Sequence, residues 1–201
     1  MGKPESICVF GDSTAWGAWD LEKGGWVTRL WADVGLRDED YVEIYNVSIS
    51  GGTSESILAR FENEARVRHA DAIIFQTGAN DATYRSTPDN VTVSPEKFRL
   101  NLERLIAKAR QITQTIAFID LRNCDESKTM PVSWDDVYCS NENFTKYGKI
   151  MEEVCQTHEV PFLEIGSLND EDFEDGLHPN AEGHRKIFEK VKNFLIEQQW
   201  I

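Results

Sequence analysis

The chain begins with the stretch Ile7-Cys8-Val9-Phe10-Gly11-Asp12-Ser13-Thr14, and this stretch decides how the rest is interpreted. Ile7–Phe10 is a continuous apolar run with β-branched and aromatic residues, which predicts a short buried strand. Gly11 allows a tight turn directly after that strand. Ser13 is therefore expected at the carboxyl end of the strand, ahead of a helix. A serine there is either an ordinary N-cap or a reactive hydroxyl.

Four further apolar runs repeat this pattern and predict strands over Val42–Val47, Ala72–Gln76, Thr115–Leu121 and Pro161–Ile165. The segments between them have helical periodicity, and Ser94 followed by Pro95 is typical of a helix start. We interpret three apolar stripes as helix faces in the core: Phe98, Leu102, Leu105, Ile106 and Ala109; Phe144, Tyr147, Met151, Val154 and His158; and Ile187, Val191, Phe194 and Leu195. Strands that alternate with helices predict an α/β fold whose parallel sheet is covered on both faces.

The composition limits the class of protein. Its 201 residues, 40% hydrophobic and 28% charged, predict a single domain over residues 1–201. The formal net charge of −14 disfavours nucleic acids and anionic membranes as partners. No apolar run approaches the ~20 residues that span a bilayer. Nothing before the first strand resembles a secretory signal, so the expected location is cytoplasmic.

The cysteines and the acidic run at Asn169–Asp175 have ordinary structural interpretations. Cys8, Cys124, Cys139 and Cys155 show no metal-ligand spacing and are expected to be free thiols. Cys124 and Cys139 share one predicted loop and would pair only in an exported protein. The acidic run is interpreted as a solvated loop rather than a calcium site, because no EF-hand spacing accompanies it.

A second chemically informative stretch is Asp175-Gly176-Leu177-His178-Pro179-Asn180. Gly176 allows a turn and Pro179 is suited to the start of a helix, so His178 is expected on a loop. A three-residue offset across the turn can place the Asp175 carboxylate beside His178 Nδ1, which leaves Nε2 as a general base for Ser13. A lone Asp-x-x-His pair is more often structural than catalytic. Its combination with Gly-Asp-Ser is a much stronger indication of catalysis. The remaining histidines, His69, His158 and His184, are expected to be structural.

Two glycine- and asparagine-containing clusters, Ser48–Ser54 and Thr77–Asp81, follow the second and third predicted strands. Acyl transfer needs donors aimed at a developing oxyanion. A glycine N–H, an asparagine amide and the Ser13 N–H could provide three. Each cluster alone is an ordinary turn, but the carboxyl ends of parallel strands share one edge of the sheet, where ligands bind. All four clusters are therefore expected to lie together.

The four clusters resemble, in order, the four sequence blocks of the SGNH (GDSL-type) hydrolase family, from residue 11 to about residue 183. The resemblance implies a flavodoxin-like three-layer α/β/α sandwich with a five-stranded parallel sheet of order 2-1-3-4-5, and no metal or organic cofactor. It implies that Ser13 is the nucleophile, His178 the base and Asp175 the residue that orients it. The implied oxyanion-hole donors are Ser13, Gly51 and Asn80, and the family's Ser-Gly-x-Thr pattern favours Gly51 over Gly52. Asp12 and Asp81 are expected to have supporting, structural roles.

The expected activity is that of a serine esterase or acylhydrolase, acting on an acyl ester of a small or carbohydrate-type substrate through a covalent acyl-enzyme. Lysophospholipase, thioesterase and acyltransferase activities are alternatives within the same family. A flavodoxin-like nucleotide- or flavin-binding module is the non-enzyme alternative, disfavoured because no Gly-x-Gly-x-x-Gly or P-loop follows the first strand. The Gly-x-Ser-x-Gly elbow of the α/β-hydrolases is excluded by Ala15. The expected partner is a small-molecule ester. The sequence does not decide whether the protein forms a homo-oligomer.

Two predicted loops, Ala82–Val93 and Arg122–Asn141, are longer than their connections require, which is typical of functional loops. The second carries the apolar residues Met130, Pro131, Trp134 and Tyr138, which should rest against another surface. We predict Trp134, Tyr138 and Tyr84 as substrate-binding residues. The alternative is that these aromatic side chains pin the loops or form a dimer contact.

Overall fold

A five-stranded parallel sheet runs through the computed structural model, which describes residues 2–35, 41–120 and 123–201. Its strands are β1 (Ser6–Phe10), β2 (Glu43–Asn46), β3 (Ala72–Gln76), β4 (Thr115–Asp120) and β5 (Phe162–Glu164), in the spatial order β2-β1-β3-β4-β5. The predicted α/β class and the implied strand order are confirmed. The observed strand ends lie within one residue of the predicted ones, and Leu121 lies outside the described residues.

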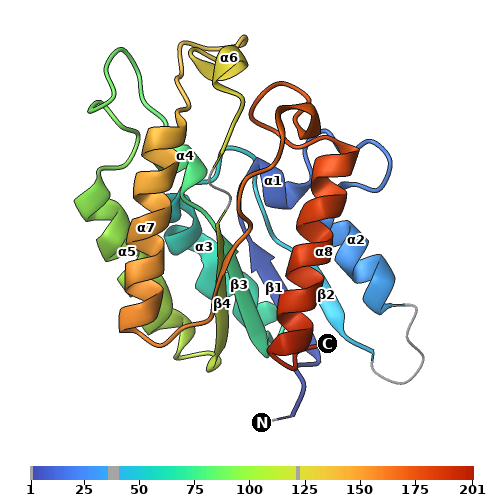
Figure 1. The fold of residues 1–201 in the computed structure, drawn as a ribbon. Coiled ribbons are helices and arrows are strands. Elements are labelled where there is room, and N and C mark those ends of the chain that lie inside the picture. The colour runs from blue at the N-terminus through green and yellow to red at the C-terminus, as the bar shows by residue number, and fades with distance from the viewer. Residues whose placement is uncertain (1, 36–40, 121–122) are drawn as a thin grey trace.

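Five long helices cover both faces of the sheet and complete the three-layer α/β/α sandwich. They are α2 (Gly25–Val34) and α8 (Ala181–Glu197) on one face, and α3 (Ser54–Val67), α5 (Pro95–Ala109) and α7 (Asn141–Thr157) on the other (Figure 1). Ile7 and Val9 of β1 point into the core beneath α2 and α8, whereas Cys8 and Phe10 point into the core beneath α3, α5 and α7. Both faces of the central strands are buried, which is why β1, β3 and β4 have continuous apolar runs.

The helix starts follow their capping residues. Ser94 Oγ accepts the Lys97 N–H at 3.3 Å and Pro95 is the first residue of α5, as predicted. The predicted stripes are buried except for His158, which is the C-cap that follows α7. The start of α8 was predicted at Pro179, and this was wrong. Asn180 is the N-cap, because its side-chain oxygen accepts the N–H groups of the first turn, and the helix begins at Ala181.

Short elements gather at the carboxyl edge of the sheet, where the loops cluster at the top of Figure 1. They are α1 (Ser13–Trp16), α4 (Ala79–Ala82), α6 (Glu126–Thr129) and the 3-10 helix η1 (Asp170–Asp172). Each is too short to leave a periodic signal in the sequence. Most of the acidic run was interpreted as a solvated loop, and Asp172 departs from that interpretation. That carboxylate is buried and accepts two hydrogen bonds from Lys186 Nζ at 2.7 Å.

Two further sequence expectations concern the cysteines and membrane-spanning segments. Cys8, Cys124, Cys139 and Cys155 are buried free thiols, as expected. Within the described residues, no helix has both the length and the apolar character needed to cross a membrane.

Candidate active site

Ser13 begins α1 immediately beyond the carboxyl end of β1. Asp12 caps this short helix, because its Oδ1 accepts the Thr14 N–H at 2.9 Å and Gln76 Nε2 at 3.0 Å. Gly11 is required by close packing rather than by an unusual backbone angle. A Cβ at this position would lie 2.5 Å from Ala15 Cβ and 3.0 Å from the Gln76 carbonyl oxygen. The absence of a side chain at Gly11 therefore allows the close packing that places Ser13 at the edge of the sheet.

The structure brings the three predicted triad residues into hydrogen-bond contact. His178 Nε2 lies 2.9 Å from Ser13 Oγ, and His178 Nδ1 lies 2.8 Å from Asp175 Oδ2. The turn between them is local, since Asp175 Oδ1 accepts the N–H groups of Leu177 and His178 at 3.0 and 2.8 Å. Gly176 has a φ of 91°, the left-handed conformation that the turn requires.

The protonation of His178 follows from the charge of Asp175. Burial alone would raise the pKa of Asp175, but the hydrogen bonds from His178 outweigh it and lower that pKa below its ordinary value. An ionised carboxylate only accepts hydrogen bonds, so His178 Nδ1 carries the ring proton. Nε2 is then left to accept the Ser13 hydroxyl proton. This geometry is able to generate a serine nucleophile.

Two tryptophan side chains flank His178. The Trp134 ring centroid lies 5.8 Å from the His178 ring and the Trp19 centroid lies 6.2 Å from it. Trp19 Nε1 also donates a hydrogen bond to Asp175 Oδ2 at 2.8 Å. Trp134 was predicted from the sequence as a site residue, whereas Trp19 was not. The available signal for Trp19 was weak, because nothing in the sequence shows where its side chain points.

Asn80 lines the same small pocket as Ser13, and Gly51 follows β2, the neighbour of β1 in the sheet. Asn80 Nδ2 donates to the Gly52 carbonyl oxygen at 3.1 Å, which fixes the amide and leaves its second hydrogen for another acceptor. The Gly52 N–H donates to the Ile49 carbonyl at 2.9 Å, whereas no described residue accepts the Gly51 N–H. Gly51 is exposed, with a φ of 75° and open space where a Cβ would lie. These contacts favour Gly51 over Gly52 as a donor.

A small pocket of about 20 Å³ adjoins Ser13 on this side. It is lined by Asp12, Ser13, Thr14, Ala79, Asn80, Thr83 and Leu177. About 10–15 Å³ on this measure is enough for one water-sized group. The pocket therefore suits a group of roughly the size of a methyl beside the Ser13 hydroxyl.

Two buried carboxylates support the site from below. Asp81 accepts hydrogen bonds from the Ser54 N–H at 3.0 Å and the Ser54 hydroxyl at 2.5 Å. Burial raises the pKa of Asp81 to about 6, and it raises the pKa of Asp12 to about 6 as well. Neither hydrogen bonds to His178 in the structure. Their contacts fit the structural roles expected from the sequence.

The two long loops meet over the site. The Tyr84 and Tyr138 rings stack with centroids 5.2 Å apart, and their backbones pair through two hydrogen bonds of 3.1 and 2.9 Å. Arg85 and Asp135 add an ion pair at 2.6 Å. These contacts hold the loops to each other, which is what the loop-pinning alternative expects. The roles of Tyr84 and Tyr138 as substrate-binding residues stay predictions.

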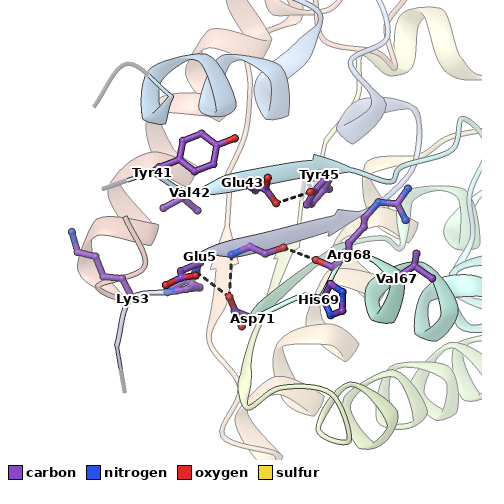
Figure 2. A pocket seen from close by; sticks show the side chains of 12 residues that line it. Lys3, Glu5, Tyr41, Val42, Glu43, Tyr45, Val67, Arg68, His69 and Asp71 are labelled. Carbon is purple, nitrogen blue, oxygen red and sulfur yellow. Dashed lines mark hydrogen bonds between the residues drawn. The ribbon is translucent and has the colours of Figure 1, made fainter. Parts of the chain in front are cut away.

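A separate pocket of about 730 Å³ lies at the opposite edge of the sheet (Figure 2). Ser6 at the amino end of β1 lines it, whereas Ser13 follows the carboxyl end. Several of its polar groups are paired with one another: Tyr45 donates to Glu43 at 2.6 Å and Asp71 Oδ2 accepts the Glu5 N–H at 3.1 Å. No pair of groups with the Ser13–His178 geometry lines it among the described residues.

Other nucleophiles and ligand sets are poorly placed. Burial raises the pKa of Cys124 to about 11 and that of Cys139 to about 12, so neither thiol is ionised near neutral pH. His184 is buried, with Nε2 2.9 Å from the Ala18 carbonyl oxygen, and is structural as predicted. In the part of the chain that the structure describes, no three His, Cys, Asp or Glu side chains are grouped as a metal site.

A parallel α/β sheet with a serine, a histidine and an aspartate in mutual contact beyond its carboxyl edge is typical of hydrolases with a serine nucleophile. The model of the GDSL-like lipase/acylhydrolase family matches residues 9–186, and the chain belongs to this family. Its class is accordingly carboxylic ester hydrolase rather than nucleotide- or flavin-binding module.

Three individual proteins are similar to this chain in sequence or in fold. An arylesterase from Vibrio mimicus is 27% identical over 195 residues, which cover 96% of this chain and 89% of the relative. The crystal structure of a lipase/acylhydrolase from Enterococcus faecalis is similar, with a TM-score of 0.78, 21% identity and 96% coverage of both chains. An acetylxylan esterase from Geobacillus stearothermophilus has a TM-score of 0.77 at 16% identity, covering 97% of this chain and 95% of its own.

Proposed function

We propose that the protein is a serine esterase that removes a short acyl group, preferentially acetyl, from a small or carbohydrate-type ester. The observation that carries this proposal is the continuous contact from Ser13 Oγ through His178 to Asp175, at 2.9 and 2.8 Å. These are hydrogen-bond distances that suit proton transfer from a nucleophile to a general base. No other described serine combines this geometry with a position beyond the carboxyl edge of the sheet.

In the first half of the reaction, Ser13 Oγ attacks the ester carbonyl carbon while His178 Nε2 takes the hydroxyl proton. The positive charge that develops on His178 is stabilised by Asp175, which stays ionised. The carbonyl oxygen becomes an oxyanion that the N–H groups of Ser13 and Gly51 and the Asn80 amide can bind. His178 then protonates the leaving alcohol, and Ser13 is left acylated.

In the second half, water enters the position that the alcohol has left. His178 Nε2 takes a proton from this water, and the hydroxide attacks the acyl carbon. Collapse of the second oxyanion intermediate returns the proton to Ser13 Oγ and releases the carboxylic acid. Atoms and charges balance without a metal or an organic cofactor.

The size of the pocket beside Ser13 supports a short acyl group. Its volume of about 20 Å³ fits the methyl of an acetyl ester and favours it over a longer chain in the same position. A pocket that rejects one extra methylene discriminates by ~10–200-fold. The acetylxylan esterase whose fold this chain shares also points to acetyl esters of carbohydrates.

The position of Trp134 favours a substrate whose alcohol group, on the other side of the scissile bond, is cyclic or aromatic. Its side chain is 53% exposed, although its ring lies only 5.8 Å from that of His178. An indole beside the base offers a flat apolar surface to a sugar or phenol ring. The arylesterase relative is consistent with such an alcohol.

The test is a series of nitrophenyl esters from acetyl to octanoyl, together with acetylated xylosides. We expect kcat/KM to be highest for acetyl and to fall at least ~10-fold by butyryl. A serine-directed fluorophosphonate should label the wild-type protein and not the Ser13→Ala variant. Labelling that persists in Ser13→Ala contradicts the proposed nucleophile. A maximum at octanoyl contradicts the acetyl preference and supports the lysophospholipase alternative.

A further inference from the structure

Trp19 lies on the loop that follows the Ser13 helix. Its indole N–H donates to Asp175 Oδ2 at 2.8 Å, the same oxygen that lies 2.8 Å from His178 Nδ1. Ser13, on the same segment, contacts the other ring nitrogen of His178 at 2.9 Å. Residues 13–19 therefore hold the Asp175–His178 turn at two points, one at the base and one at the carboxylate.

The backbone around Trp19 is built to keep this side chain in place. Trp19 has a φ of 66°, a conformation that is unfavourable for a bulky residue and persists where its surroundings fix it. The Ala18 carbonyl oxygen before it lies 2.9 Å from His184 Nε2. Asp20 after it accepts hydrogen bonds from the Arg29 guanidinium and from three backbone N–H groups of the loop, those of Glu22, Lys23 and Gly25.

The contact completes the hydrogen bonding of Asp175. Three of its donors, the Leu177 N–H, the His178 N–H and His178 Nδ1, come from its own turn. Among the described residues, Trp19 is the donor that comes from elsewhere in the chain. A fourth donor from a rigid loop restricts rotation of the carboxylate. It also draws off part of the negative charge that Oδ2 presents to His178.

We propose that Trp19 is a positioning residue of the ester hydrolysis: its indole N–H fixes the Asp175 carboxylate and moderates its pull on the proton of His178. This inference rests on the function proposed above. Without the N–H, the carboxylate is free to rotate away from the productive geometry. Its charge also acts more fully on the positive charge that His178 gains during the reaction.

Other ionisable groups near the triad remain unchanged when Trp19 is replaced. Asp12, beneath Ser13, and His184, behind the loop, both interact electrostatically with His178. Lys128 and Cys139 interact with Asp175. A difference in pH dependence between the wild type and a Trp19 variant therefore reports the lost hydrogen bond.

The experiment compares Trp19→Phe with a protein that carries 3-benzothienyl-alanine at position 19, which keeps the shape of indole and replaces its N–H by sulfur. Trp31→Phe is the matched control, because Trp31 lies on α2 and is similarly exposed, at 53% against 50% for Trp19. We expect both position-19 replacements to lower kcat for an acetyl ester by ~10-fold with little change in KM, since a hydrogen bond to a charged group contributes about this much. The acid limb of kcat/KM should move to higher pH.

The outcomes separate this inference from the proposed function. An unchanged kcat and acid limb in the benzothienyl protein overturns the role of Trp19, because the shape of the side chain is preserved. A lower kcat with an unchanged acid limb and a lower melting temperature indicates packing alone and also overturns it. Fluorophosphonate labelling of Ser13→Ala would instead show that the proposed triad has failed, whatever the Trp19 variants do.

Discussion

Two regions of the site contain aspartate carboxylates whose pKa values are shifted in opposite directions. One is the Asp175–His178 turn. The other is the buried layer beneath Ser13, which we define as Asp12, Ser54, Gln76 and Asp81. The pKa of Asp175 is lowered, because hydrogen bonds from His178 outweigh its burial. The pKa values of Asp12 and Asp81 are raised to about 6, because burial dominates over their hydrogen bonds. The two kinds of carboxylate thus differ in their access to solvent. The partly exposed one keeps its charge beside a base, whereas the buried ones hold the backbone in place.

The comparison also explains why the site tolerates three aspartates close together. Asp175 is the residue that has the His178 ring as a partner, and His178 gains positive charge during the proposed reaction. Asp12 and Asp81 receive donors that are neutral, such as the Thr14 N–H and the Ser54 hydroxyl. A neutral donor fixes geometry without changing its own charge, which suits a supporting layer.

The largest expected effect comes from exchanging aspartate for asparagine in the two regions. Asp175→Asn should lower kcat by ~10⁴-fold with a small change in melting temperature, because the amide favours the wrong tautomer of His178. Asp81→Asn should do the reverse. It turns one acceptor of the two Ser54 hydrogen bonds into a donor, which costs about 1–3 kcal/mol of folding stability.

The measurements are kcat on an acetyl ester and the melting temperature of each variant. A loss of ~2–4 °C per kcal/mol is expected at this chain length. The kcat of folded Asp81→Asn should stay within ~10-fold of the wild type. Equal losses of activity in the two variants would mean that the division between a reactive turn and a supporting layer does not hold.

The next effect concerns Asn80, which lies between the two regions. If its free amide hydrogen binds the oxyanion, Asn80→Ala should lower kcat by ~10²–10³-fold and leave KM nearly unchanged. The alternative is a turn asparagine that only holds the Gly52 carbonyl oxygen. That alternative predicts a lower melting temperature with a near-normal kcat, so the two measurements together decide between them.

Much of the fold could be predicted because local signals agree with the tertiary structure. The runs at β1, β3 and β4 are apolar throughout since both faces of these strands are buried. The contact of Asp175 with His178 could also be predicted, because both residues lie on one short turn with Gly176 at a φ of 91°.

The errors arise where contacts between distant segments decide the outcome. Lys186 on α8 buries Asp172, although its neighbours in the sequence suggest a solvated loop. Trp19 reaches Asp175 across 156 positions of sequence, and its backbone angle is set by contacts of the neighbouring Ala18 and Asp20. The start of α8 is a local exception, because the Asn180 side chain caps the first turn and the helix begins at Ala181 rather than at Pro179. Composition and periodicity carry no information on the first two cases.

The smallest expected effect is on the pH dependence of stability, and it tests the buried layer directly. A carboxyl group whose pKa is raised on folding binds more protons in the folded than in the unfolded state. Its contribution is therefore fully present below about pH 4 and is lost as the pH rises through about 6. The lowered pKa of Asp175 acts in the opposite direction, but only below its unfolded value of about 4. Between pH 7 and pH 5 the buried layer should dominate, and the melting temperature should rise as the pH falls.

Asp12→Asn isolates this contribution from the general relief of a net charge of −14. The amide oxygen of the substituted side chain can still accept the Thr14 N–H and Gln76 Nε2, since both bonds reach a single oxygen in the wild type. The variant thus keeps these two contacts and loses the titrating proton. We expect its melting temperature at pH 7 to equal or exceed that of the wild type, and to rise by a few degrees less between pH 7 and pH 5. Parallel melting curves for the two proteins would show that Asp12 is ionised throughout this range, which removes the proposed contrast with Asp175.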